Sequence, residues 1–163
     1  MHCVRQARPD DLVSFVEIYN HYVATTHFTF DTELFTPLTR QPWFQQFDGR
    51  RHRCLALVDD NDVIGYASSA PLKSKAAYET SVEVSIYLAP SATGRHFGAP
   101  LYDALFTQLE SEDVHRAYAL IALPNDASIA FHRSFGFKEV AHLNEVGRKF
   151  ARYWDVVWLE KAL

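Results

Sequence analysis

The segment SIYLAPSATGRHFGAPLYDALFTQL, residues 85–109, constrains the fold more than any other part of the sequence. A strand pattern ends at a glycine-bearing turn, and a helical pattern with Leu101, Leu105 and Leu109 on one face follows directly. This junction leaves backbone N–H groups unpaired at the positive end of a helix, where they attract phosphate. On spacing alone, an anion site and a plain tight turn around Gly94 and Gly98 explain it about equally well.

The remaining segments predict an α/β fold, a mixed β-sheet with helices packed on it. Strands are expected around Val4 and at residues 53–58, 63–72, 82–88, 117–123, 137–143 and 153–159. Helices are expected after a cap at Asp10 and at residues 38–47, 97–109 and 126–135, the last ending at Gly136. No repeat, linker or low-complexity tract interrupts residues 1–163, so a single domain is predicted.

Composition and charge exclude several classes of partner. With 163 residues, of which 48% are hydrophobic, the chain can build one substantial core. A formal charge of −4 without clustered Lys and Arg argues against nucleic acid. No apolar run is long enough to span a membrane, and MHCVRQARPDD lacks a signal-peptide pattern. We therefore expect a cytoplasmic protein with no membrane partner.

The cysteines and histidines show no metal-binding pattern. Cys3 and Cys54 each lie in an apolar, strand-like segment without CxxC spacing, which predicts buried free thiols rather than a disulfide. The eight histidines form neither HxxxH nor HExxH. No metal cofactor is expected.

Several segments together resemble a known enzyme family. APSATGRHFGAPLYDAL resembles the acyl-CoA pyrophosphate loop of GNAT superfamily N-acetyltransferases. EIYNHYV, FTFDTE, VIGYA, KAAYETSVEVSIYLAP, ALPNDASIAFHRSFGF and YWDVVW are similar, in this order, to the phosphinothricin and methionine-sulfone branch of that superfamily. The resemblance covers nearly the whole chain. It implies the splayed central sheet of the GNAT fold, acetyl-CoA as co-substrate, a small amino-acid-like amine as acceptor, and a homodimer.

The resemblance also identifies residues expected to bind the cofactor. They are Ile86, Tyr87, Leu88, Thr93, Gly94, Arg95, His96, Phe97, Gly98, Ala99 and Asn125. Two loop residues depart from the family pattern, since His96 replaces its first glycine and Thr93 replaces Gln or Arg. We expect His96 to adopt the loop geometry and its backbone still to donate, because the rest of the loop and the helix start are intact. Asn125 also suits an N-cap of the short helix, and both roles can coexist.

Acetyl transfer to an amine requires a base, and Glu83 is the best candidate. The alternation of its strand places it on one face with Ser85 and Tyr87, where partial burial would raise the pKa of the carboxyl. From the residues alone, a solvent-facing strand glutamate is the simpler interpretation. The resemblance favours the base, because SVEVSIYL matches the segment that carries the family's acidic base. A backbone N–H around residues 86–88 would polarise the thioester carbonyl.

The departing thiolate requires a proton, for which His132 is the candidate. It lies four residues before the Gly-Phe that ends the short helix, where many superfamily members have tyrosine and this branch commonly has histidine. A helix histidine satisfied by a neighbour is the alternative, and Tyr102 ranks after His132. Neither cysteine lies in a motif for a covalent acyl-enzyme, so direct attack by the amine is expected.

The acceptor pocket is expected to have aromatic walls. Phe28, Phe30 and Tyr78, with Tyr22 as a further candidate, lie in segments that resemble the family's substrate-binding loops, although aromatic residues are more often core. Lys73, Lys75, Arg148 and Lys149 are candidates for binding an anionic group, with no choice among them. Two other functions stay open: acetylation of another amine, such as a polyamine, an aminoglycoside or a protein N-terminus, and a non-catalytic CoA-binding module.

Overall fold

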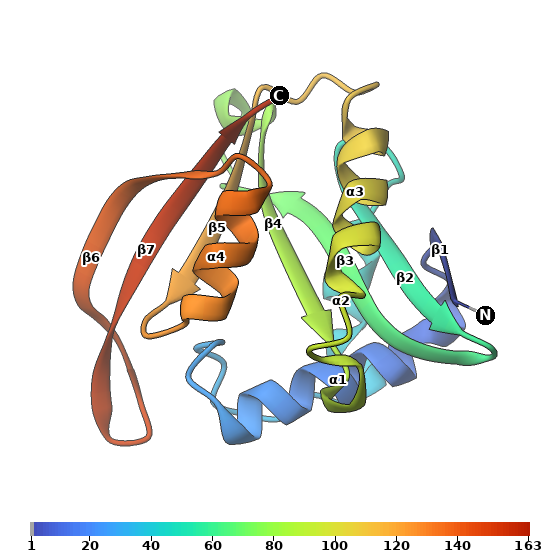
Figure 1. Cartoon of the computed structure of the whole chain (residues 1–163), viewed down its shortest axis with the longest axis horizontal. Coiled ribbons are helices and arrows are strands. Elements are labelled where there is room, and N and C mark those ends of the chain that lie inside the picture. Colours follow the sequence, from blue (N-terminus) through green and yellow to red (C-terminus); the bar gives the residue numbers. More distant parts are fainter. Residues whose placement is uncertain (1) are drawn as a thin grey trace.

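Residues 2–163 are described by a computed structural model, in which seven strands form one mixed sheet in the order β1-β2-β3-β4-β5-β7-β6 (Figure 1). The strands are β1 (His2–Gln6), β2 (Arg53–Asp59), β3 (Asp62–Pro71), β4 (Ser81–Leu88), β5 (Arg116–Ala122), β6 (Lys138–Lys149) and β7 (Arg152–Ala162). All neighbouring strands are antiparallel except β4 and β5, which are parallel. The predicted mixed α/β architecture is confirmed.

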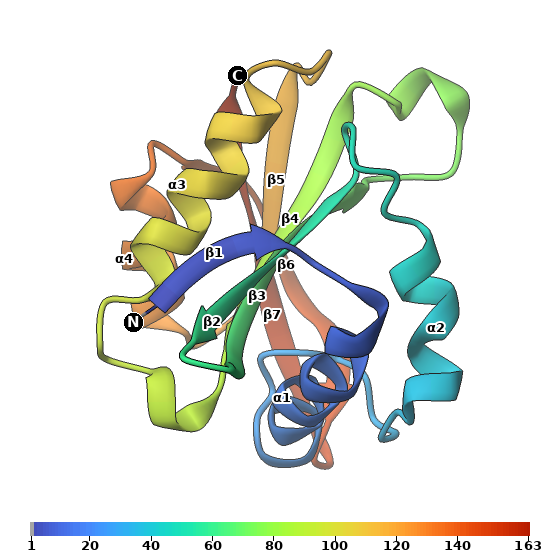
Figure 2. The ribbon, with the colours of Figure 1, turned by 90° about the vertical axis from the view of Figure 1, so that its right-hand side faces the viewer.

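Within residues 2–163, four helices and three short 3₁₀ turns connect the strands. The helices are α1 (Leu12–Thr25), α2 (Pro37–Gln45), α3 (Gly98–Leu109) and α4 (Asp126–Ser134), and the turns are η1 (Pro9–Asp11), η2 (Ala76–Tyr78) and η3 (Pro90–Ala92). Figure 2 shows α3 and α4 on one side of the sheet, with α1 and α2 on the other. No helix within residues 2–163 is long and apolar enough to cross a membrane.

Strand β2 is apolar along its length because helices cover both faces of the sheet, α3 on one face and α1 on the other. Leu55 and Leu57 are fully buried in the cluster that contains the apolar face of α3, whereas Cys54 and Ala56 belong to the cluster around Phe15 of α1. Because side chains alternate between faces, a strand covered on both faces must be apolar at every position.

The parallel pair β4 and β5 separates soon after it forms. Between them, only Ser81–Glu83 of β4 are paired with β5, at Arg116–Tyr118. On its other side, β4 stays paired with β3 as far as Leu88. Figure 1 shows the two strands diverging toward the end of the sheet where α1 lies. Within the described part of the chain, the β5-facing backbone edge of residues 84–88 therefore has no strand partner, as the expected splayed sheet requires.

Three local predictions need correction. Cys3 is exposed rather than buried, because β1 is an edge strand, while Cys54 is buried as expected. Asp10 does not cap α1; the carboxylate of Asp11 accepts the backbone N–H of Arg8 at 2.6 Å, because a 3₁₀ turn precedes the helix. The last two strands are also longer than predicted and meet in a tight turn at residues 150–151.

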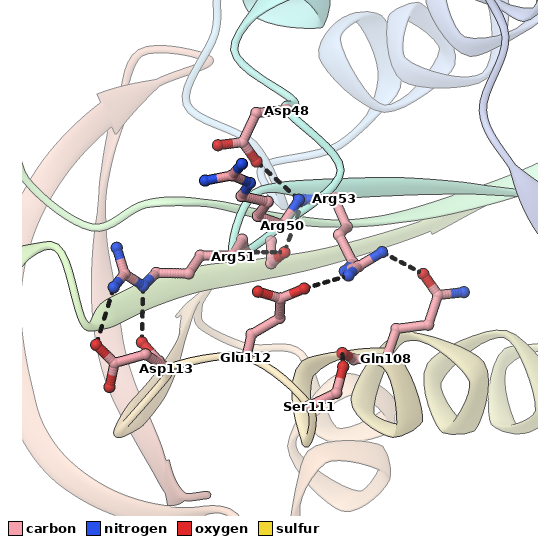
Figure 3. A network of polar contacts seen from close by, with 9 residues as sticks. Asp48, Arg50, Arg51, Arg53, Gln108, Ser111, Glu112 and Asp113 are labelled. Carbon is pink, nitrogen blue, oxygen red and sulfur yellow. Dashed lines mark hydrogen bonds and ion pairs between the residues drawn. The ribbon is translucent and has the colours of Figure 1, made fainter.

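A polar network fastens β2 to the C-terminal end of α3 (Figure 3). The guanidinium of Arg53 donates to Glu112 at 2.5 Å and to Gln108 at 2.9 Å. Arg51 donates to both the backbone carbonyl and the carboxylate of Asp113. This network holds the strand hairpin against the helix whose opposite end begins at the glycine-bearing turn.

Candidate active site

A groove of about 670 Å³ opens where β4 and β5 separate. The turn before α3 and one face of α4 complete its walls. Of the residues expected to bind the cofactor, those lining this groove are Ile86, Tyr87, Leu88, Thr93, Gly94, His96, Phe97, Gly98, Ala99 and Asn125. Arg95 is not a lining residue; its guanidinium lies 4.7 Å from the ring centroid of Phe97. Residues distant in sequence are thus brought together along one free strand edge.

The turn before α3 has the backbone geometry that glycine adopts most easily. Gly94 has φ 72° and His96 has φ 61°, both in the left-handed region. His96 therefore takes up, as a non-glycine residue, the conformation for which the family pattern has glycine. Gly98 has a different reason to be glycine, since an added Cβ would lie 3.2 Å from a ring carbon of Phe131 on α4.

Asn125 both caps α4 and lines the groove. Its side-chain oxygen accepts the backbone N–H of Ser128 at 3.2 Å, which caps α4, and the residue also lines the groove. Its amide N–H₂ group has no hydrogen bond within the described residues, so that donor is free for a ligand.

A second cavity, of about 440 Å³, lies beside the groove on β3 and β4. Cross-strand pairing sets Glu83 opposite Ala70, Ser85 opposite Ser68 and Tyr87 opposite Tyr66, and all six residues line this cavity. Phe28, Ser85, Tyr87 and Leu120 line both spaces, so the cavity and the groove meet. The arrangement can hold two reactants side by side.

Glu83 is the carboxylate of the second cavity. Burial raises the pKa of its carboxyl, and the positive charge of Lys73 opposes the rise without cancelling it. Among the described residues, no hydrogen bond or ion pair engages the carboxylate. A half-buried carboxylate with a raised pKa and free oxygens is suited to accept a proton.

His132 lines the groove and is only 4% exposed. Its Nδ1 lies 2.8 Å from the carbonyl oxygen of Ser128, and its Nε2 lies 2.9 Å from the hydroxyl of Tyr102. Burial lowers the pKa of the imidazole. The Ser128 carbonyl can only accept, so Nδ1 carries the proton of the neutral ring and Nε2 accepts from Tyr102.

The predicted aromatic residues divide into two groups. Phe28 and Phe30 line the second cavity, and Tyr22 lines the groove, where its hydroxyl donates to the carbonyl of Leu88 at 2.6 Å. Tyr78 lines neither space, because it lies on η2 with 46% of its surface exposed. The four candidate cations, Lys73, Lys75, Arg148 and Lys149, also lie outside both.

Sequence reasoning missed several residues of the second cavity. Tyr66 and Ser68 were detectable, because they alternate along β3 on one face. Arg40 and Trp43 of α2 gave no such signal, since this helix has no fully buried residue and contains Pro42. Only the folded chain places them against α1 and β3.

Comparison with known proteins identifies the family. The model of the acetyltransferase (GNAT) family matches residues 15–137. The chain belongs to this family. It is 50% identical, over 98% of its length and 95% of the relative's, to a phosphinothricin N-acetyltransferase of Streptomyces coelicolor. It is 29% identical, over 96% and 92%, to an L-methionine sulfoximine/L-methionine sulfone acetyltransferase of Pseudomonas aeruginosa.

A solved structure agrees with the fold and contains acetyl-CoA. A phosphinothricin acetyltransferase from Sinorhizobium meliloti in complex with acetyl-CoA superposes with a TM-score of 0.94 and 28% identity, covering 99% of this chain and 88% of the other. The groove of this protein fits that ligand, because it combines a free strand edge, N–H donors at a helix N-terminus and apolar walls. No cluster of His, Cys, Asp and Glu suited to a metal occurs within residues 2–163.

Proposed function

We propose that this N-acetyltransferase transfers the acetyl group of acetyl-CoA to the primary amine of a small amino-acid-like acceptor. Phosphinothricin, methionine sulfone and methionine sulfoximine are the acceptors named for its relatives. The observation that carries the proposal is the meeting of the two spaces at Ser85 and Tyr87, with Glu83 in the smaller one. The larger groove holds the donor and the smaller cavity holds the acceptor.

The first step is deprotonation of the acceptor. An aliphatic ammonium is protonated near neutral pH and cannot attack a carbonyl, so Glu83 takes its proton directly or through one water molecule. The raised pKa of Glu83 brings the carboxylate closer in basicity to the amine. The free amine then attacks the thioester carbonyl, a C–N bond forms, the C–S bond breaks, and CoA departs as a thiolate.

The second step is protonation of the thiolate, for which we propose His132. After attack, the nitrogen carries one proton more than the amide retains, and this proton must reach the sulfur so that CoA leaves as the thiol. His132 lines the groove and relays this proton. Tyr102 does not line the groove, and burial raises the pKa of its hydroxyl far above the usual value, so its hydrogen bond to Nε2 positions the imidazole and does not supply the proton.

We also propose that the protein works as a homodimer. The β6–β7 hairpin exposes about half of the surface of four large apolar side chains, Val140, Val146, Phe150 and Tyr153. Exposed apolar surface on one projecting element is typical of a protein interface.

The test is CoA release from acetyl-CoA by the purified protein with a panel of amines. The panel holds the three proposed acceptors, ordinary amino acids, a polyamine and an aminoglycoside. Turnover confined to the three proposed acceptors is the expected result. Turnover of the polyamine or aminoglycoside instead would overturn the proposed acceptor class, and binding of acetyl-CoA without turnover of any amine would overturn the reaction.

A further inference from the structure

The guanidinium of Arg40 lies among three aromatic rings at the wall of the acceptor cavity. Its central carbon is 4.4 Å from the ring centroid of Tyr19, 4.6 Å from that of Phe35 and 4.4 Å from that of Trp43. Arg40 itself is half-buried and lines the cavity. Stacking on rings fixes the position of a guanidinium without using up its five N–H donors.

Those donors have no protein partner. Within residues 2–163, no hydrogen bond or ion pair of the Arg40 side chain is found, and its Nε is completely buried and unpaired. The carboxylate of Asp31 accepts the hydroxyl of Tyr19 rather than pairing with Arg40. The terminal nitrogens of Arg40 are not among the buried unpaired atoms, so they are the donors open to the cavity, and a fixed cation with free donors in a cavity wall is suited to an anionic ligand.

Arg40 and Glu83 lie toward opposite ends of this cavity. The Tyr19 ring beside Arg40 contacts the Tyr87 ring, with centroids 5.1 Å apart. Tyr87 follows Glu83 by four residues on β4, and the two are separated by about 13 Å of strand rise. Ser68 and Ser85 lie between them. The cavity therefore presents a carboxylate, a polar middle and a guanidinium in sequence.

We propose that Arg40 binds an anionic group at the far end of the acceptor's side chain. The cavity would then select amino acids whose side chains end in a phosphinate or a carboxylate over neutral isosteres. The α-carboxylate of an amino acid is attached to the same carbon as the amine, so it stays near Glu83 and does not extend to Arg40. This inference rests on the proposed function for the position of the amine.

Two acceptors form a matched pair for the test. Phosphinothricin ends in a methylphosphinate, which is anionic, and methionine sulfone ends in a methylsulfone of nearly the same shape, which is neutral. Their dissociation constants would be measured by titration calorimetry on protein saturated with CoA, so that no turnover occurs. The variants are Arg40→Met, Arg40→Lys and, as a control, Arg152→Met, because Arg152 also stacks on an aromatic ring, at 4.3 Å from Trp154, but lines neither space.

The expected result is a change in preference. The wild type binds phosphinothricin more tightly than methionine sulfone. Arg40→Met raises the dissociation constant of phosphinothricin relative to that of methionine sulfone at least about tenfold, as expected for loss of a charge-assisted hydrogen bond. Arg40→Lys gives a smaller rise, and Arg152→Met leaves the ratio unchanged. Binding of methionine sulfone by each variant shows that its cavity is folded.

Two results would overturn the inference: a wild type without the preference, or an unchanged ratio in Arg40→Met. An unchanged ratio with equal weakening of both ligands would place the α-carboxylate at Arg40. Turnover of methionine sulfone by the wild type tests the proposed function separately. Turnover with an unchanged ratio contradicts only the role of Arg40. An altered ratio without any turnover contradicts only the proposed reaction.

Discussion

Glu83 is proposed to accept a proton from the acceptor amine, and its burial as a charged carboxylate lowers the stability of the fold. Both effects can be measured in one variant. A base works only when deprotonated, so kcat/KM should rise with pH through the raised pKa of this carboxyl. We expect Glu83→Gln to lower kcat by about 10²- to 10³-fold and to remove that acidic limb. Initial rates of CoA release across pH would show this. An unchanged limb would exclude Glu83 as the base.

The same substitution should stabilise the fold at neutral pH. Burial raises the pKa of Glu83 above its value in the unfolded chain, so the folded state favours the protonated carboxyl. Its contribution to the free energy of unfolding is fully present below the unfolded pKa and is lost as pH rises through the folded pKa. Glu83→Gln should therefore raise the melting temperature at pH 8 and change it little at pH 4. Equal shifts at both pH values would contradict this.

His96 tests whether the glycine-bearing turn before α3 tolerates a side chain. Its φ of 61° costs a non-glycine residue about 1 kcal/mol, and the cost is the same with and without ligand if the turn keeps its shape. We therefore expect His96→Gly to change the CoA dissociation constant by less than about threefold, while stability stays equal or rises. Calorimetric titration with CoA measures the effect. A large gain in affinity would mean that His96 distorts the turn.

At the scale of elements, the β6–β7 hairpin carries strain that glycine would relieve. Lys149 pairs with Arg152, so Phe150 and Ala151 form a two-residue turn, with φ values of 53° and 59°. Such turns favour Asn-Gly, because both positions are left-handed. We expect Ala151→Gly to raise the melting temperature by about 2–4 °C, since roughly 1 kcal/mol of strain is removed.

A second substitution to glycine, elsewhere in the hairpin, provides the control for this prediction. Ala141 lies within β6 and is not among the residues with positive φ. Ala141→Gly should lower the melting temperature, because glycine within a strand loses more conformational entropy on folding and has no side chain to pack. Differential scanning calorimetry would compare the two variants, and a lower melting temperature for Ala151→Gly would contradict the assigned turn.

The elements that sequence predicted well are those with a local signal. The alternation at residues 82–88 and the stop at Gly136 arise from neighbouring residues, so they could be read without a structure. The exposure of Cys3 depends on the place of β1 at the sheet edge, which no local pattern records. The tight turn at Phe150 and Ala151 lacks the glycine or asparagine that would have marked it.

At the scale of the whole molecule, the candidate active site depends on contacts between distant segments. Glu83 and the glycine-bearing turn were predicted from sequence because their segments resemble motifs of the GNAT superfamily; the residues alone favour a solvent-facing glutamate and leave the turn undecided. Arg40 was not predicted from sequence. Its importance comes from the rings of Tyr19 and Trp43 that surround it and from the lack of a hydrogen-bond partner for its side chain within residues 2–163. An unpaired cation is a property of three-dimensional packing and leaves no trace in residue spacing.

The β6–β7 hairpin connects the proposed dimer to the acceptor cavity. The ring of Phe30, which lines that cavity, packs so closely on Gly147 of β6 that a Cβ there would overlap it. We expect the wild type to have about twice the 18.7 kDa mass of one chain by light scattering. A double variant, Val146→Lys with Tyr153→Lys, should return it to one chain, because two buried charges oppose association.

The monomeric variant should also bind the acceptor less well. If a partner covers the hairpin, it restricts the motion of β6 and so holds Phe30 at the cavity wall; without the partner, Phe30 is less fixed. We expect KM for the acceptor to rise several-fold while KM for acetyl-CoA changes little, because the groove is formed by β4, α3 and α4. A single-chain mass for the wild type would contradict the dimer, and a dimeric double variant would place the interface elsewhere. Monomers with an unchanged acceptor KM would show that the hairpin supports the cavity without a partner.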